Sequence, residues 1–555
     1  MSQSMLTGTQ LNSNMTCLFK WSYQPSIPVL CDFTQSFAKP RQKLEAVEAE
    51  IERMQAMLVS LQQFRVQLKE HIGDLETPIP PIQRVPREIL LEIFKYCIPS
   101  GQCRATATKE APLLLGRVCK EWRQFSLAVP DLWTTPQFLV RPWRDAEKER
   151  LKRSVEYWLQ RSQQLPVSAA FVWNEIEGSS WDPIPLIAGF INTHSHRWQS
   201  LSFNMPTTYL SALLAAIDRS SPLLKELILK THQPRTLRRS NTNLTHFAPQ
   251  LRSITLQSLD VRDICAPWEQ LTELSLKKLT QSGVSGQTCN VFFKNLNQCS
   301  NLKSLTLSLD EAFQFEDTVP SGSVILPNLE NLTIEACSNA ILLDDDCRGQ
   351  FMDALIVPKL KAFTMTSKSP FHVGRWHHNE FLALITRSAC TIESLDFTDT
   401  SISNDQLLEC LQATSSLRQL LMAYSKPQPS SDIDSLFHTL TPTLSLGNSV
   451  HYKIFCPRLE MLHVRTRTFS EDAAIAMIEP RLRGCGLSGV THLQKFWWGV
   501  PPGKNYSDLR RKVAQLEAYA TGHELGSEQT SYRPPGSRLA ATDLVHLRFE
   551  FSPSC

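Results

Sequence analysis

The residues that most resemble a metal-binding or reactive group form a histidine cluster in the second half of the chain. His372, His377 and His378 stand close to Glu380, and imidazole with carboxylate is a ligand set that divalent transition metals accept. The segment is bounded by proline and glycine, and we expect adjacent histidines in such a segment to face solvent. We therefore predict no metal site here.

Other reactive patterns are also weak. Asp344, Asp345 and Asp346 carry enough charge to touch a cation, but they fit a charged loop tip. The fifteen cysteines are scattered singly without a C-x-x-C pair, which fits reduced, mostly buried thiols. The sequence has no glycine-rich phosphate loop, no H-E-x-x-H and no G-x-S-x-G turn. We predict a protein that is not an enzyme, with no cofactor, no metal and no catalytic residue.

Composition limits the classes of partner. The 555 residues allow two to four domains or one repeat array, and the formal net charge is +3. A charge so near zero indicates neither a nucleic acid nor an anionic membrane as partner. There is no apolar run of about 18 residues and no leader with a compact apolar core. We expect a cytoplasmic and/or nuclear protein.

A heptad pattern begins about forty residues into the chain. Residues 1–39 are rich in Ser, Thr and Gln, so we expect a disordered leader that ends at Pro40. Residues 40–76 predict a coiled-coil helix in which Arg65 is the one polar core residue. The apolar core residues are Leu44, Ile51, Leu58 and Ile72 at one heptad position and Val47, Met54, Leu61, Leu68 and Leu75 at the other. A homodimer through residues 41–76 and packing on the same chain both stay open.

Two short amphipathic helices are expected between Val85 and Trp133. Pro86 suits the first turn of a helix, because its missing N–H would have no partner there. Apolar residues recur at helical spacing in both halves, namely Ile89, Leu90, Ile93 and Phe94, then Leu115, Val118, Trp122 and Phe125. A segment of about 50 residues has too little interior to bury both stripes, so we expect part of this surface to meet a partner.

These residues resemble the F-box. Pro86, Glu88, Ile89, Leu90, Ile93 and Phe94 match its first helix, and Val118, Cys119, Trp122, Arg123, Leu132 and Trp133 match its second half. Val85 stands where leucine is usual, and the link from Ile98 to Ala111 is long, as in the F-box proteins of mushroom-forming fungi. The resemblance implies an F-box-like domain, residues 82–136, that docks on the Skp-type adaptor of a cullin-RING ubiquitin ligase. The adaptor-binding residues implied are Pro86, Ile89, Leu90, Ile93, Phe94, Leu115, Val118, Cys119, Trp122 and Trp133.

A short L-x-x-L-x-L core recurs over the rest of the chain. Residues 137–196 are expected to connect, with a helix near 143–163 and a strand from Val167. Within residues 197–550 the cores are Leu224/Leu227/Leu229, Leu251/Ile254/Leu256, Leu271/Leu274/Leu276, Leu302/Leu305/Leu307, Leu329/Leu332/Ile334, Leu360/Phe363/Met365, Ile392/Leu395/Phe397, Leu417/Leu420/Met422 and Leu459/Leu462/Val464. Looser copies begin at Trp198 and end with Leu544, Leu547 and Phe549. The pattern resembles leucine-rich repeats, although the usual asparagine is mostly missing.

The cores predict a fold and a binding face. Each predicts a strand, and the segments between them, such as 290–297 and 405–413, have helical spacing. We therefore predict an α/β solenoid, an irregular leucine-rich-repeat array with a parallel sheet. Side chains between the leucines should face outward, and those predicted to bind a target are Glu226, Lys230, Thr255, Glu273, Lys277, Thr306, Asn331, Glu335, Asp396, His463 and Arg465. Hydroxyl residues are also simply good strand formers on a wet face.

Two functions follow from these patterns. In the first, the chain is the substrate-recognition subunit of a Skp–cullin–F-box type ubiquitin ligase, with the F-box on the adaptor and the repeats on an unknown target protein. In the second, it is a leucine-rich-repeat scaffold without a ligase, whose helical hairpin caps the solenoid. The first predicts that the apolar face of the hairpin stays open. The second predicts that the hairpin packs on residues 167–203.

Overall fold

The computed structural model describes most of the chain in two units. Residue contacts separate Met1–Leu91 from Glu92–Cys555. The described residues are 27–76, 81–99, 101–142, 144–174, 181–231, 244–259, 264–279, 288–309, 320–336, 347–367, 375–424, 433–446, 450–465, 469–483, 491, 493–500, 511–512 and 545–550.

The first unit contains the predicted coiled-coil helix. This helix, α1, spans Ile27–Glu76 and has Pro40 in its interior. It therefore begins within the predicted leader, of which residues 1–26 lie outside the described residues, and Pro40 is not its start. A proline removes one backbone hydrogen bond, and the helix continues through that loss. A short 3₁₀ helix, η1 (Pro81–Arg84), follows, and α2 (Arg87–Cys97) begins just before the boundary between the units.

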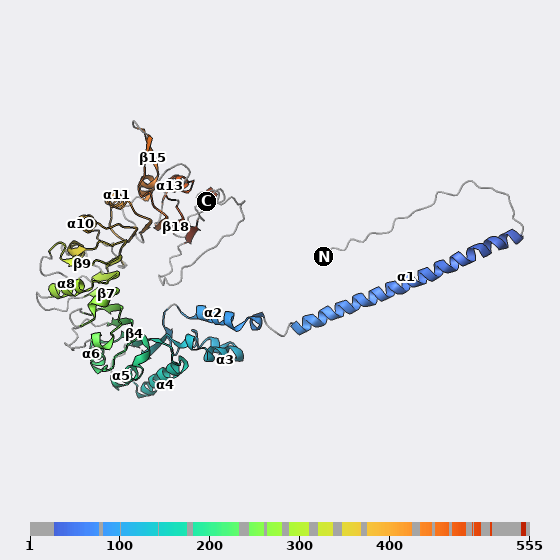
Figure 1. The fold of residues 1–555 in the computed structure, drawn as a ribbon, viewed down its shortest axis with the longest axis horizontal. Coiled ribbons are helices and arrows are strands. Elements are labelled where there is room, and N and C mark those ends of the chain that lie inside the picture. The colour runs from blue at the N-terminus through green and yellow to red at the C-terminus, as the bar shows by residue number, and fades with distance from the viewer. Residues whose placement is uncertain are drawn as a thin grey trace. The chain divides into compact units, whose positions relative to one another are not determined.

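A long parallel sheet forms the second unit (Figure 1). Fifteen strands of the described residues pair side by side, each parallel to the next except the antiparallel pair β18–β19. These strands are β1 (Cys103–Arg104), β2 (Pro136–Val140), β3 (Val167–Trp173), β4 (Trp198–Asn204), β5 (Glu226–Lys230), β6 (Ser253–Gln257), β7 (Glu273–Leu279), β8 (Ser304–Leu309), β10 (Asn331–Ala336), β12 (Ala362–Ser367), β13 (Ser394–Thr398), β14 (Gln419–Ala423), β17 (Met461–Arg465), β18 (Lys495–Val500) and β19 (Val545–Glu550). Two smaller pairs are β9 (Val324–Ile325) with β11 (Leu355–Ile356), and β15 (Thr443–Leu446) with β16 (Val450–Lys453).

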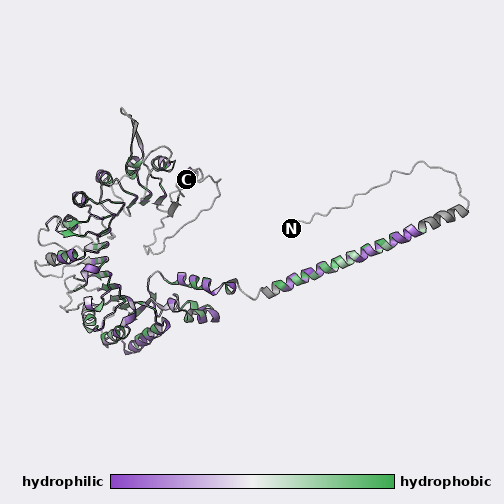
Figure 2. Ribbon diagram, in the orientation of Figure 1, coloured by the Kyte–Doolittle hydropathy of each residue, from purple (hydrophilic) through white to green (hydrophobic). Residues whose placement is uncertain are grey.

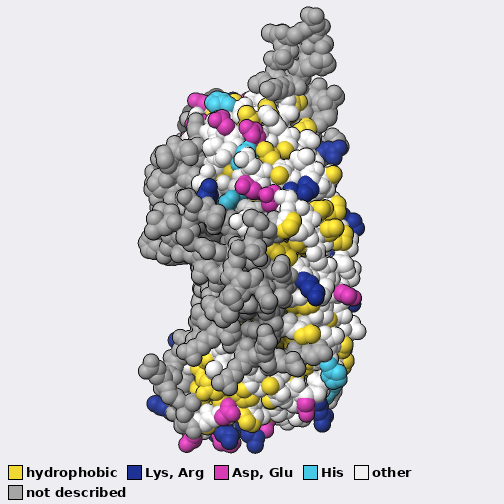
Figure 3. Space-filling model, turned by 90° about the vertical axis from the view of Figure 1, so that its left-hand side faces the viewer, with side chains coloured by type: hydrophobic (Ala, Val, Ile, Leu, Met, Phe, Trp, Pro, Cys, Tyr) yellow, Lys and Arg dark blue, Asp and Glu magenta, His cyan; other side chains and the backbone are white. Residues whose placement is uncertain are grey.

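Helices follow most strands and cover one side of this sheet. In Figure 1 the strands of the second unit line the inner side of a curve, and helices such as α6, α8 and α10 lie on its outer side. The helices are α3 (Lys120–Ala128), α4 (Asp145–Arg161), α5 (Ile184–Thr193), α6 (Thr207–Ala216), α7 (Leu244–Phe247), α8 (Thr288–Gln298), α9 (Cys347–Ala354), α10 (His378–Ser388), α11 (Asn404–Ala413), α12 (Ile433–Leu440) and α13 (Glu471–Arg483). The outer side mixes acidic, basic and apolar side chains (Figure 3). The α/β solenoid-like arrangement is therefore confirmed.

Each leucine core consists of a turn followed by a strand in which alternate side chains are buried. In β5, Leu227 and Leu229 are fully buried, while the alternate residues Glu226, Ile228 and Lys230 face away from the helices. The first leucine of most cores closes a turn, since its backbone N–H donates to the carbonyl three residues earlier, as from Leu224 to Ser221 (3.1 Å) and from Leu251 to Ala248 (3.1 Å). Proline often occupies the second position of this turn, where its fixed φ is already suitable. Turn and strand together make each core a structural repeat.

The sheet is longer than the predicted repeat region. It starts at β1, inside the segment expected to be all helical, and it includes β2 and β3 from the expected connecting segment. The predicted connecting helix is α4. One further core was missed: Leu493, Phe496 and Trp498 are fully buried at β18, where aromatic residues replace leucine. Leu547 and Phe549 of the last looser copy lie on β19, while Leu544 lies outside the described residues. This strand is antiparallel and therefore does not continue the parallel repeat.

None of the helices in the described ranges combines the length and the apolar character needed to cross a bilayer. The cysteines whose side chains are described are free. They include buried residues, such as Cys299, Cys410 and Cys456, half-buried Cys119 and Cys390, and exposed Cys97 and Cys265.

Candidate functional site

The second-unit part of α2 packs on α3 through an aromatic cluster. Phe94 is fully buried, and its ring lies 4.7 Å from that of Trp122 and 5.6 Å from that of Phe125. The Cys119 thiol caps α3 by accepting a hydrogen bond from the Trp122 N–H at 3.4 Å. These contacts fix the two helices against each other through their inner apolar faces.

The end of this helical segment is locked into the solenoid. Trp133, at the end of the 3₁₀ helix η3 (Pro130–Trp133), is 1% exposed, and its ring lies 4.9 Å from that of Trp158 on α4. Its indole N–H donates to the carbonyl of Ser126 at 2.8 Å. Trp158 in turn donates to the carbonyl of Ala105 beside β1 at 3.3 Å. The segment is thereby joined to the first layers of the sheet.

A second set of apolar residues is not covered. On α2, Ile89 is 54% and Ile93 is 38% exposed, and Val118 beside the 3₁₀ helix η2 (Leu115–Arg117) is 58% exposed. Leu114 (43%) and Tyr96 (89%) are also exposed, and neither was among the predicted adaptor-binding residues. Helical spacing could have indicated Tyr96, because it follows Ile93 by three residues. The helices thus bury one apolar set and expose another.

The predicted adaptor-binding residues therefore fall into two groups. Pro86, Ile89, Ile93 and Val118 are exposed, and Cys119 and Trp122 are half-buried. Leu90, Phe94, Leu115 and Trp133 are buried within the chain. A side chain as covered as that of Trp133 has no surface to offer a second protein, so the structure corrects the expectation that it contacts a partner directly.

The inner face of the sheet carries three rows of side chains in register. The first row, from β5 to β10, is Glu226, Ser253, Glu273, Ser304 and Asn331. The second is Ile228, Thr255, Ser275, Thr306 and Thr333, and it continues through Thr364, Asp396, Leu421 and His463 to Trp497. The third includes Lys230, Gln257 and Lys277. Between β5 and β7, acidic residues therefore line one side of a hydroxyl row and lysines line the other.

Most of the predicted target-binding residues lie on these rows, and Glu335 and Arg465 lie on a matching row from β8 to β17, which an irregularity in the pairing of β7 with β8 separates from the lysine row. Glu273 and Asn331 are exposed, and Glu335 is the exception in accessibility, since it is only 8% exposed. Burial raises the pKa of the Asp396 carboxyl, although a hydrogen bond from Thr398 at 2.9 Å opposes this shift. Sequence reasoning missed Leu421 and Trp497, whose ring lies 5.4 Å from that of His463. Trp497 was missed because its strand was not predicted.

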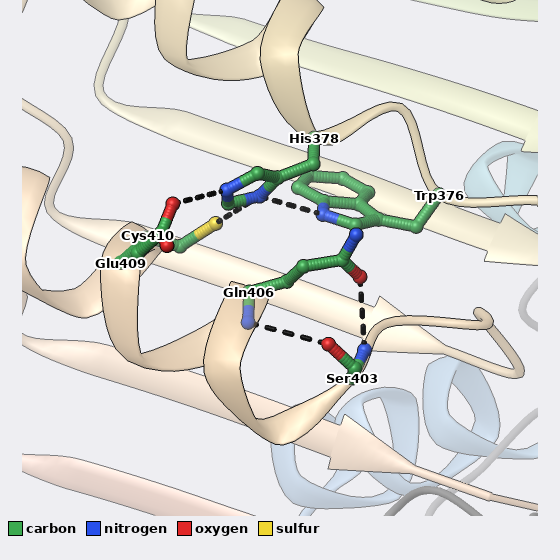
Figure 4. Close-up of polar contacts among 6 residues, drawn as sticks. All are labelled: Trp376, His378, Ser403, Gln406, Glu409 and Cys410. Carbon is green, nitrogen blue, oxygen red and sulfur yellow. Dashed lines mark hydrogen bonds and ion pairs between the residues drawn. The ribbon is translucent and has the colours of Figure 1, made fainter.

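Two residues of the histidine cluster, His377 and His378, lie in the protein rather than in solvent, contrary to the expectation. His377 is 7% exposed, and the side chain of His378 is 12% exposed, whereas His372 and the three aspartates Asp344–Asp346 lie outside the described residues. Trp376 donates its indole N–H to Nδ1 of His378 at 3.4 Å, and Nε2 of His378 lies 2.6 Å from Glu409 (Figure 4). Because an indole N–H can only donate, Nδ1 accepts, and the neutral ring carries its proton on Nε2.

Cys410 forms a cysteine–histidine–glutamate group with His378 and Glu409, but the Cys410 thiol is not in a reactive environment. Its sulfur lies 3.9 Å from Nδ1 of His378, and a capping box between Ser403 and Gln406 starts the helix that carries it (Figure 4). The Cys410 side chain is fully buried, and burial raises the pKa of its thiol to about 12. A cysteine nucleophile must be an accessible thiolate. The group therefore serves to hold α10 against α11.

The described residues contain no group of three or more His, Cys, Asp or Glu side chains that could hold a metal ion. Among the described residues of the second unit, the exposed apolar residues Ile93, Leu114 and Val118 and the polar inner face of the sheet are surfaces that could meet other molecules. The protein-family models include none that matches this chain, and no curated protein matches it.

Proposed function

We propose that the chain is the substrate-recognition subunit of a Skp–cullin–F-box type ubiquitin ligase. The F-box-like segment, residues 82–136, would bind the Skp-type adaptor, and the leucine-rich-repeat-like array would bind the target protein. The observation that carries the proposal is the exposure of Ile93 on α2 and Val118 in the turn before α3, at 38% and 58%, next to helices whose inner apolar residues are packed. Exposed aliphatic side chains beside a rigid core are typical of a protein-binding surface.

In this role the chain has no catalytic residue. It brings a target close to a ubiquitin-charged enzyme, so that the effective concentration of the target's lysines replaces chance encounter. A rigid connection between the two binding surfaces makes this transfer geometrically reproducible. The contacts of Trp133 with Trp158, and of Trp158 with Ala105, support such a connection. We place this activity in the cytoplasm and/or the nucleus.

The inner face of the sheet fits a polar protein target. Glu226 and Lys230 lie four residues apart on one strand, which separates the acidic row from the lysine row by about 13 Å. Lys230 and Lys277 have no ion-pair partner among the described residues, and the hydroxyl row lies between them and the glutamates. A segment with basic groups on one side and acidic groups on the other would complement both rows. Neither nucleic acid nor membrane offers that pair of charges.

The adaptor interaction is tested by titrating purified Skp-type adaptor into the full chain. We expect binding, and we expect Val118→Asp or Ile93→Asp to weaken it by about 2 kcal/mol, a roughly thirtyfold higher Kd. Both side chains are exposed, so these changes should leave the fold intact. Leu223→Asp is the matched control, because Leu223 is 43% exposed but lies in the turn before β5. A folded wild-type chain that does not bind the adaptor would refute the proposal.

The second candidate is a leucine-rich-repeat scaffold without a ligase. The burial of Trp133 against α4 favours it, because a terminal cap packs on its first repeat in this way. A cap does not need exposed Ile93 and Val118, however, and this difference is why we prefer the ligase subunit. The same titration separates the two functions, since the scaffold alone predicts no adaptor binding by a chain that still captures a target.

A further inference from the structure

The long helix α1 has a continuous apolar stripe that its own residues cannot bury. Its core heptad side chains between Leu44 and Ile72, apart from Arg65, are between 45% and 59% exposed. Met57 (64%) and Phe64 (57%), which flank this stripe, are exposed as well. Figure 2 shows apolar turns recurring along the helix. A stripe of this length and spacing is the contact surface of a two-helix coiled coil.

We propose that α1 dimerises with α1 of a second copy of this chain, in antiparallel orientation. When the two stripes are centred on Leu58 and Leu61, each core residue faces one of the other heptad position. Ile51 then faces Leu68 of the second copy, Leu58 faces Leu61, and Ile72 faces Val47. The pairing is isologous, so each of these contacts occurs twice.

The charges beside the two stripes are complementary in the antiparallel register, which supports a second copy as the partner. In the antiparallel register the flanking residue Glu48 faces Lys69 of the second copy, and Glu50 faces His71. Both are acid–base pairs, and both occur twice because of the two-fold symmetry. Glu50 also forms an ion pair with Arg53 on its own helix at 2.7 Å. Substitutions at Glu48 and Lys69 therefore test the contact between the two copies more directly. Charges at such flanking positions set partner choice and orientation in coiled coils.

Arg65 favours the antiparallel dimer over a parallel one. In a parallel dimer the two Arg65 side chains would face each other at the same level of the core, which brings like charges together away from water. In the antiparallel dimer each Arg65 faces Met54, and its guanidinium can extend along that aliphatic neighbour toward solvent. Met57 then also faces Phe64 of the second copy. Arg65 is therefore tolerated in one orientation and opposed in the other.

The association is tested first by light scattering on the full chain. We expect twice the mass of one chain at micromolar concentration, and Leu61→Asp should shift the mass to that of a single chain. Gln63→Asp is the matched control, because Gln63 lies on the outer face of the same turn, and it should leave the dimer intact. A wild-type mass of one chain overturns the proposal, and so does a dimer that survives Leu61→Asp.

The orientation is tested by cross-linking and by charge exchange. In the antiparallel dimer the two copies of residue 51 are about 26 Å apart along the axis, so Ile51→Cys alone should not form a disulfide-linked dimer. Ile51→Cys combined with Leu68→Cys should form one, relative to the native cysteine background. Glu48→Lys should raise the dimer Kd about tenfold, and adding Lys69→Glu should restore it. Cross-linking by Ile51→Cys alone, or no rescue, overturns the antiparallel arrangement.

Discussion

Trp133 provides a direct test of whether the early helical segment and the solenoid form one cooperative body. Its indole N–H donates to the Ser126 carbonyl at 2.8 Å. That carbonyl would ordinarily accept from the N–H four residues later, but Pro130 stands there and has no N–H. The side chain therefore satisfies the end of α3 while its ring packs on α4 at Trp158.

Two substitutions separate these contributions. Trp133→Phe keeps a ring but removes the donor, which leaves the carbonyl of buried Ser126 without a partner and should cost about 1–3 kcal/mol. Trp133→Ala removes the ring from a site that is 1% exposed, and it should cost about 3–5 kcal/mol. The difference in free energy of unfolding between the two variants measures the packing of the ring on Trp158.

Hydrogen exchange followed by mass spectrometry gives the spatial readout. In Trp133→Ala we expect faster exchange in α3 and also in α4, because both helices lose their contact with the indole ring. Urea unfolding followed by circular dichroism gives the total loss in free energy of unfolding. Faster exchange in α3 with α4 unchanged would refute the reasoning, since it would show that the helical segment opens without the solenoid.

Three further outcomes follow from buried polar groups. Arg481→Met should lower the free energy of unfolding by about 3 kcal/mol in urea. The fully buried guanidinium donates to the carbonyls of Leu440 at 2.8 Å and Cys456 at 3.1 Å, and these bonds would be lost. An unchanged urea midpoint of unfolding would contradict this prediction. Burial raises the thiol pKa of both Cys410 and Cys456 to about 12, above the unfolded value. The contribution of each thiol to the free energy of unfolding is therefore complete below about pH 8.5 and falls by about 1.4 kcal/mol per pH unit above it. Urea unfolding at pH 8 and pH 10 should show the loss, and Cys456→Ala should reduce it. Ser403→Ala removes half of a capping box and should cost about 1 kcal/mol, seen as faster exchange confined to the first turn of α11.

The repeat strands were predictable because their signal is local. In a core such as Leu227 and Leu229, alternate residues are fully buried, and the period of two along a strand is visible in the sequence itself. The turn before each strand was equally visible, since its proline fits one position of a defined hydrogen-bonded turn. The expected solenoid was therefore largely specified by residues that are neighbours in the chain.

What was missed depends on contacts between distant residues. His378 was expected in solvent, but Trp376, Glu409 and Cys410 surround it, and two of these come from the following repeat. Trp133 was expected on a partner surface, although its neighbour Trp158 lies on a helix that forms later in the chain. The short strand β1 has only two residues, too few to show a period. Such features arise only once the sheet has brought its layers together.

The arrangement of the two sheet edges has a consequence for self-association. An open parallel edge would present unpaired backbone groups to other molecules, and natural proteins usually blunt such edges. Here one edge is the very short strand β1, and at the other β19 pairs antiparallel with β18. The sequence of β19 alternates His546, Arg548 and Glu550 with apolar residues, and charge on an edge discourages further strand addition. Removing β19 would expose the paired edge of β18 along its whole length and should promote aggregation by strand-to-strand pairing.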